Sequence, residues 1–123
     1  MSGTILLSDI QSTNNYPENV KEDILNNYYA NREVRVKGFI TKNIEVGGTK
    51  LYELTNFVIS CCAVDATTVS ALLETQDSLN NNQWLKVIGK IKVIEYKNSK
   101  TLIIKADEIE KISPPNSPYE YPE

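Results

Sequence analysis

The chain contains no histidine and little cysteine or tryptophan: two Cys and one Trp in 123 residues. Imidazole is the usual general base near neutral pH and the commonest metal ligand, so its absence excludes a histidine-based hydrolase triad and a histidine-ligated zinc site. Two cysteines are too few for a disulfide framework, and adjacent cysteines bond to each other only through a strained ring. The cysteine content therefore indicates no redox compartment.

Long apolar runs and excess positive charge are also missing. No stretch approaches the roughly 18 apolar residues that a membrane-spanning helix needs. The first residues, MSGTILLS, lack the basic region and long apolar region of an export signal. We therefore expect no membrane insertion by this chain itself. The formal charge is −3 and the pI about 5.0, so no global positive field favours nucleic acid as a partner.

Before residue 33 the chain carries two short apolar segments. Residues 4–10 (TILLSDI) predict an edge strand or the first pass of a sheet, ended by polar residues. Pro17 and Glu18 suit the first turn of a helix. Apolar residues then recur at helical spacing, which predicts one shared face: Val20, Ile24, Leu25 and Tyr28.

From Glu33 the hydrophobic period changes to two, which indicates a strand with one wet face. One face carries Val34, Val36, Gly38 and Ile40. The pair Gly47-Gly48 supplies the positive φ angles that a tight hairpin turn needs. Residues 50–60 are therefore expected to return as a second strand.

A later segment repeats this design, because residues 85–93 alternate and residues 97–106 supply a turn and a returning strand. VRVKGFI at 34–40 and LKVIGKI at 85–91 both carry a glycine in mid-strand, where a strand bends as a sheet coils into a barrel. Between the hairpins, residues 67–74 (TTVSALLE) fit a strand or a short helix, and their β-branched residues favour a strand.

The expected order is strand with glycine, hairpin, central strand, strand with glycine, hairpin. That order matches the five-stranded, partly open barrel of the OB-fold. We predict a mainly β, OB-like barrel in residues 33–112, with a strand and a short helix in residues 1–32 packed on it. Residues 113–123 hold four of the five prolines and predict an extended tail. The length suits one domain in all.

Five stretches resemble, in order, the C-terminal soluble domain of the YcgQ-type family of bacterial membrane proteins: VRVKGFI, FVISCCAVDA, VSALLE, QWLKVIGKIKVIEY and NSPYEYP. The resemblance covers residues 33–122, and the adjacent cysteines followed by Ala and Asp are its most specific feature. It implies an accessory or sensing role with a permease as protein partner, in a membrane-associated context linked to metal handling. The family has hydrophobic N-terminal segments that are missing here, so an excised domain or a free-standing relative is expected.

Cys61 and Cys62 follow the second expected strand, where successive side chains point to opposite faces. In one interpretation both are packing residues, since free cysteine is among the residue types most often buried. In the other, the two thiolates and Asp65 bind a soft metal ion or undergo reversible oxidation. A closed zinc site needs four ligands, so metal binding would need a second copy or a partner. No other cofactor is indicated.

Exposed basic residues support a different alternative, an OB-fold that binds single-stranded nucleic acid. Such proteins combine a positively charged groove with aromatic platforms. The residues proposed for this role are Arg35, Lys37, Tyr52, Lys90 and Lys92, and further candidates are Phe39, Lys86, Trp84 and Tyr96. The acidic total argues against it, and lysines are ordinary on solvated strand faces. Trp84 is better interpreted as a core residue at the barrel mouth.

No pattern predicts catalysis. The acidic residues fall on loops or alternating surface positions, with no partner pattern that would split their pKa values. The sequence thus predicts a non-catalytic binding or interaction module. The alternatives are the nucleic-acid-binding barrel and a thiol-based metal or redox sensor, while ligand, localisation and oligomeric state are not predicted.

Overall fold

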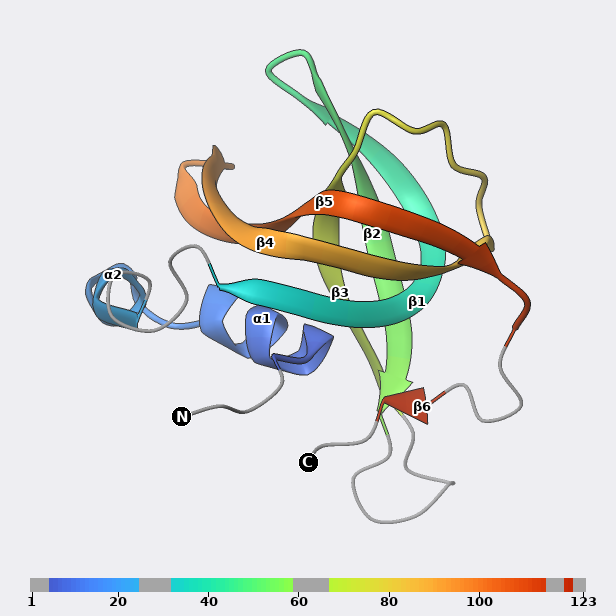
Figure 1. The fold of residues 1–123 in the computed structure, drawn as a ribbon. Coiled ribbons are helices and arrows are strands. Elements are labelled where there is room, and N and C mark those ends of the chain that lie inside the picture. The colour runs from blue at the N-terminus through green and yellow to red at the C-terminus, as the bar shows by residue number, and fades with distance from the viewer. Residues whose placement is uncertain (1–4, 25–31, 59–66, 115–118, 121–123) are drawn as a thin grey trace.

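A computed structural model describes residues 5–24, 32–58, 67–114 and 119–120 of the chain (Figure 1). Two short helices come first, five long strands follow, and a two-residue strand ends the described part. Their bounds are α1 Leu7–Asn14, α2 Glu18–Ile24, β1 Glu33–Val46, β2 Thr49–Val58, β3 Thr67–Glu74, β4 Trp84–Tyr96, β5 Ser99–Ile112 and β6 Tyr119–Glu120.

The five long strands form a closed barrel. In the sheet they follow the order β1-β4-β5-β3-β2, and β1 also pairs with β2, which joins the two ends. All neighbours are antiparallel except β3 and β5, which run parallel over three residue pairs. This is the OB-like arrangement that the strand pattern predicted.

Alternating side chains and two glycines shape the barrel. Val34, Val36 and Ile40 of β1 are buried in the core, as the period of two predicts. A Cβ on Gly38 would lie 2.5 Å from the carbonyl oxygen of Thr55, and one on Gly89 would lie 2.3 Å from that of Lys105. The β4–β5 register shifts between Ile88 and Gly89, and the β1–β2 register shifts between Ile40 and Lys42, two residues after Gly38, so the strands bend at or near both glycines, as expected.

Both long hairpins close with two-residue turns in the left-handed region. Gly47 and Gly48 have φ of 55° and 82°, and Lys97 and Asn98 have φ of 52° and 63°. Such turns match the twist of the paired strands. Both hairpins stand where the sequence predicted them.

The prediction of a strand at residues 4–10 is wrong, because α1 occupies Leu7–Asn14. Leu7, Ile10 and Thr13 are buried at intervals of three, which is a helical rather than a strand period. Asp9 supports the start of the helix, since its carboxylate accepts a hydrogen bond from the Leu6 N–H at 2.9 Å. The helix packs on β3 and β5.

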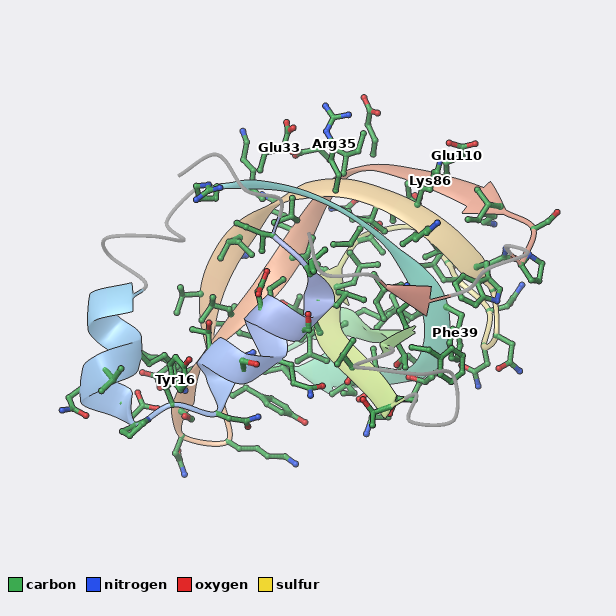
Figure 2. The ribbon with its side chains drawn as sticks, turned by 90° about the horizontal axis from the view of Figure 1, so that it is seen from below. Tyr16, Glu33, Arg35, Phe39, Lys86 and Glu110 are labelled. Atoms are coloured by element: carbon green, nitrogen blue, oxygen red, sulfur yellow. The ribbon has the colours of Figure 1, made fainter. Side chains whose placement is uncertain are left out.

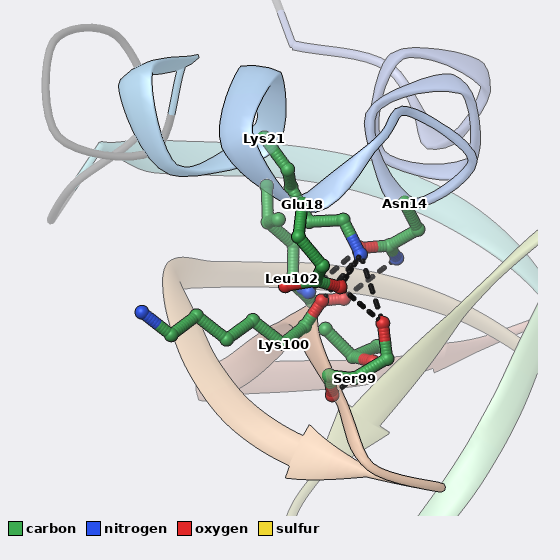
Figure 3. A network of polar contacts seen from close by, with 7 residues as sticks. Asn14, Glu18, Lys21, Ser99, Lys100 and Leu102 are labelled. Carbon is green, nitrogen blue, oxygen red and sulfur yellow. Dashed lines mark hydrogen bonds and ion pairs between the residues drawn. The ribbon is translucent and has the colours of Figure 1, made fainter.

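The second helix, α2, is where the sequence predicted it, but its inner face differs. Val20 is 42% exposed, whereas Lys21 is only 2% exposed. The Lys21 ammonium donates to the carbonyl of Lys100 at 2.7 Å, the hydroxyl of Ser99 at 3.3 Å and the carboxylate of Glu18 at 3.2 Å (Figure 3). A lysine with several acceptors is stable at such a site, so polar contacts dock α2 on the β4–β5 turn.

Asn14, at the end of α1, reinforces this docking. Its side-chain amide donates to the Leu102 carbonyl at 3.1 Å and its oxygen accepts from the Leu102 N–H at 2.8 Å. The amide thus pairs with β5 as a neighbouring strand would (Figure 3). The N-terminal helices are therefore fastened to the β4–β5 hairpin at two places.

The tail adds one more strand. β6 pairs parallel with β2, with Tyr119 opposite Phe57 and Glu120 opposite Val58. It thereby joins a sheet edge that residues 113–123 were not predicted to reach.

Candidate functional site

A groove of about 740 Å³, called here the main groove, lies on the surface of the barrel. Three segments line it: the β1–β2 turn at residues 48–50, the end of β3 and its continuation at residues 74–77, and residues 105–109 of β5. They meet because the barrel closes between β3 and β5, which lie at separate places in the sequence. Only the closed barrel therefore builds this site.

The main groove is lined by more acidic than basic side chains. Its carboxylates are Glu74, Asp77, Asp107 and Glu108, and its cations are Lys50 and Lys105. Four negative charges against two positive ones make the groove repel phosphate groups and attract cationic ones. The sequence carried no signal for this grouping, because the carboxylates come from β3, the connection that follows it and β5, which only the fold brings together.

A smaller hollow of about 120 Å³ continues from the main groove, since Thr49 and Glu74 line both. Apolar Val46, Leu51 and Ile94 supply much of its wall. Its remaining residue, Lys92, forms an ion pair with Glu74 at 2.9 Å. Lys92 was a nucleic-acid candidate, but here its charge is paired with a carboxylate.

The other basic candidates lie on the outer side of β1 and β4. Arg35 lies opposite Ile88 and Lys37 lies opposite Lys86, so these strands present cations side by side. Figure 2 shows Arg35 and Lys86 pointing outward, with Glu33 and Glu110 on the same side. Arg35 forms an exposed ion pair with Glu33 at 3.3 Å. Acidic neighbours thus break up this positive surface.

Lys90 extends the same surface, and a groove of about 530 Å³ lies along it. Lys90 is exposed and stands opposite Glu33 of β1. The groove is lined by three cations, two carboxylates and four apolar residues: Arg35, Lys37, Lys86, Glu108, Glu110, Val36, Val87, Ile88 and Ile109. We call it the outer groove.

Tyr52 does not lie with these cations. Its ring is 1% exposed within the core, and its hydroxyl donates to the Asp77 carbonyl and accepts from the Leu79 N–H, both at 3.2 Å. A ring in that position has no face for a nucleotide base to stack on. Tyr52 instead ties the β3–β4 connection to the barrel.

Trp84 is buried, with 9% of its surface exposed, but it packs outside the main core. Leu85 and Val87 alternate into the core, so Trp84 does not share the face of Leu85. Its ring centroid lies 5.0 Å from that of Phe39, whose ring lies 5.6 Å from that of Phe57. The three rings form a row across β4, β1 and β2.

Cys61, Cys62 and Asp65 lie outside the described residues, between β2 and β3. Their metal or redox role therefore stays a prediction. Among the residues that the structure does describe, no three His, Cys, Asp or Glu side chains are grouped to hold a metal ion.

A closed barrel with this strand order and a groove beside its first hairpin defines an OB-like β-barrel domain. Within that class, the chain belongs to the DUF1980 C-terminal domain family, whose model matches residues 8–122. No curated protein matches the chain. This family match says nothing about a permease. The permease association expected from the YcgQ-type resemblance therefore stays a prediction.

Three solved structures with distant similarity are 12 to 13% identical to this chain. The N-terminal domain of PriB from Thermoanaerobacter tencongensis is 13% identical, with a TM-score of 0.42, over 66% of this chain and 96% of that one. A small single-stranded DNA-binding protein from Streptomyces coelicolor is 13% identical, with a TM-score of 0.41, over 68% and 94%. Asparaginyl-tRNA synthetase from Pyrococcus horikoshii is 12% identical, with a TM-score of 0.46, over 91% and 23%.

The fold assignment rests on the strand order of the barrel, and these low scores are not used to support it. A separate finding concerns membranes: within the ranges that the structure describes, neither helix has the length and apolar character needed to cross one.

Proposed function

We propose that this domain is a non-catalytic interaction module that binds a segment of a partner protein in the main groove. The observation that carries the proposal is the lining of that groove, with four carboxylates, two lysines and an adjoining apolar hollow. A polypeptide with basic and apolar side chains complements such a lining, whereas a phosphate backbone does not. The exposed position of most of these carboxylates suits binding better than general acid or base chemistry.

The partner that we propose is a membrane permease of the kind implied by the YcgQ-type resemblance. That resemblance includes the glycine-bearing strands and the stretch around Cys61 and Cys62. In this role the domain would be an accessory protein that works together with the permease in the membrane. The structure contributes the binding surface to this proposal, and the resemblance contributes the partner.

Charge reversal in the main groove tests the proposal. Asp77→Lys and Asp107→Lys place a repulsive charge at two exposed groove positions, and Glu110→Lys makes the same change outside it. Binding is measured by thermophoresis against a detergent-solubilised permease of the kind that the YcgQ-type resemblance implies. We expect each groove variant to weaken binding at least about tenfold, a typical size for an interfacial charge. Equal binding by all three variants would contradict the groove assignment.

Single-stranded nucleic acid is the second candidate function, because Lys37 and Lys86 stand side by side near Arg35 and Lys90. The main proposal predicts no binding to a labelled oligonucleotide at low salt in a gel-shift measurement. Tight binding that weakens steeply with salt, and that Lys37→Glu abolishes, would replace the permease proposal by this one. The matched control is Lys50→Glu, which changes a lysine in the main groove.

A further inference from the structure

The outer faces of β1, β4 and β5 carry charges in a repeated order across the sheet. Two neighbouring rows of paired residues, read from β1 through β4 to β5, are Lys37, Lys86 and Glu110, and then Arg35, Ile88 and Glu108. Both rows begin with a cation on β1 and end with a carboxylate on β5. Figure 2 shows Arg35, Lys86 and Glu110 pointing outward from the barrel.

The opposite charges at the two ends of each row do not neutralise each other. Neighbouring strands are about 4.8 Å apart, so β1 and β5 are separated by about 10 Å across β4. Among the residues that the structure describes, Lys37, Glu108 and Glu110 form no ion pair. Arg35 pairs with Glu33 of its own strand through one of its five N–H donors. The face is therefore a dipolar surface, positive along β1 and negative along β5.

This order of charges decides what kind of partner fits the face. The carboxylates of β5 repel a polyanion, and the cations of β1 repel a polycation. A fitting surface carries both signs in the reverse order. The same face of a second copy provides that order when it is turned by 180° about an axis parallel to the strands, whereas an axis across the strands would bring like charges together.

We propose that this face is the contact surface of a symmetric dimer of the chain, in which β1 of one copy lies over β5 of the other. Lys37 of each copy then faces Glu110 of the other copy, and Arg35 faces Glu108, so the interface holds each pair twice. Packed sheets cross at about 30°, so the two β4 strands meet at one point and diverge on either side of it. The half-buried Ile88 supplies an apolar contact there.

Single charge reversals test the dimer at Lys37 and Glu110, which do not line the main groove. By sedimentation equilibrium we expect the unchanged chain to dimerise with a Kd on the order of 100 μM at low salt. Association should weaken at about 0.5 M NaCl, because salt screens exposed charges. Lys37→Glu and Glu110→Lys each introduce two repulsive contacts and should raise the Kd at least about tenfold. Glu95→Lys, at an exposed position near the end of β4, is the matched control and should leave the Kd unchanged.

Two combinations of these variants distinguish the dimer from a general effect of charge. A mixture of Lys37→Glu with Glu110→Lys brings opposite charges together in the mixed dimer, and the double variant restores both pairs with their signs exchanged. In both cases the Kd should return to within about threefold of that of the unchanged chain. An unchanged chain that is monomeric at about 1 mM would overturn the proposal. Single variants that associate normally, or combinations that stay as weak as the single variants, would overturn it too.

Discussion

At the scale of single residues, Gly38 and Gly89 mark where strands approach each other too closely for any side chain. The atom that blocks a Cβ is in both cases a backbone carbonyl oxygen, which cannot rotate away. Gly89 lies beside a register shift and Gly38 lies two residues before one, so the tight approach and the bend occur close together. Sequence alone located these bends, because two strands of similar pattern carried a glycine at the same point.

Alanine at either bend should destabilise the barrel. We expect Gly38→Ala and Gly89→Ala to lower the free energy of unfolding by about 2 to 3 kcal/mol each, since the backbone must shift to admit the methyl group. Gly47→Ala is the matched control: its Cβ meets nothing within 4 Å, and only its positive φ costs about 1 kcal/mol. Urea denaturation measures all three. Equal losses would contradict the close-approach explanation.

Glu18 makes the docking of α2 dependent on pH. The hydrogen bond from Ser99 and the neighbouring Lys21 hold the pKa of Glu18 below its ordinary value of 4.5. Because the folded pKa is the lower one, the carboxylate favours the docked helix fully above 4.5, and this contribution is lost as the pH falls through the folded pKa. The protection of amides near Ser99 against hydrogen exchange, measured relative to the intrinsic chemical rate, should therefore fall as the pH drops below 4.5.

The control for this pH effect is Glu18→Gln, which keeps the shape of the side chain and removes its titration. Exchange near Ser99 in this variant should not depend on pH below 4.5 beyond the intrinsic chemical rate. An unchanged pH profile in Glu18→Gln would show that another group is responsible.

The cysteine pair gives a prediction that rests on sequence alone. If the thiols bind metal, Cys61→Ser with Cys62→Ser will lower metal content, measured by elemental analysis of the purified chain. If they are packing residues, the same variant will keep metal content and partner binding and lose only stability, by about 1 to 2 kcal/mol. Asp65→Asn tests the third suggested ligand in the same assay.

At the scale of elements, the N-terminal helices act as a clamp on the β4–β5 hairpin. Asn14 pairs with Leu102, and Lys21 reaches Ser99 and Lys100, so both ends of the contact lie on one strand. We expect Asn14→Ala to speed hydrogen exchange of the Leu102 amide at least about tenfold, because its acceptor is removed. Asn15→Ala, one residue on, is the control. Equal protection of Leu102 in both variants would contradict the clamp.

The elements that the sequence predicted well are those with local causes. Both hairpins have turn residues at fixed positions, and their strands alternate in period two. Residues 7–14 were wrongly predicted as part of a strand, because a short apolar run fits the period of a strand or of a helix. The helix is selected by the packing of Ile10 and Thr13, which are buried. The burial of Lys21 was also missed, since it depends on acceptors from residues 99 and 100, far along the chain.

At the scale of the whole molecule, the candidate sites follow from closure of the barrel. The main groove joins residues near 49, 75 and 107, and no local pattern signals that grouping. The basic surface on β1 and β4 was visible in the sequence as alternating cations. The sequence did not show that acidic residues of β5 lie beside these cations and interrupt the surface. Local patterns thus predicted the architecture, while the binding surfaces needed the three-dimensional arrangement.

The parallel contact between β3 and β5 also has a consequence for biosynthesis. Leu72 pairs with Ile103, which the ribosome adds 31 residues later. Until then the nascent chain presents an unpaired flank of β3, the kind of edge that draws other unfinished chains together. Protection of that flank during translation, by a chaperone or by α1, would decide how much newly made chain reaches the finished barrel.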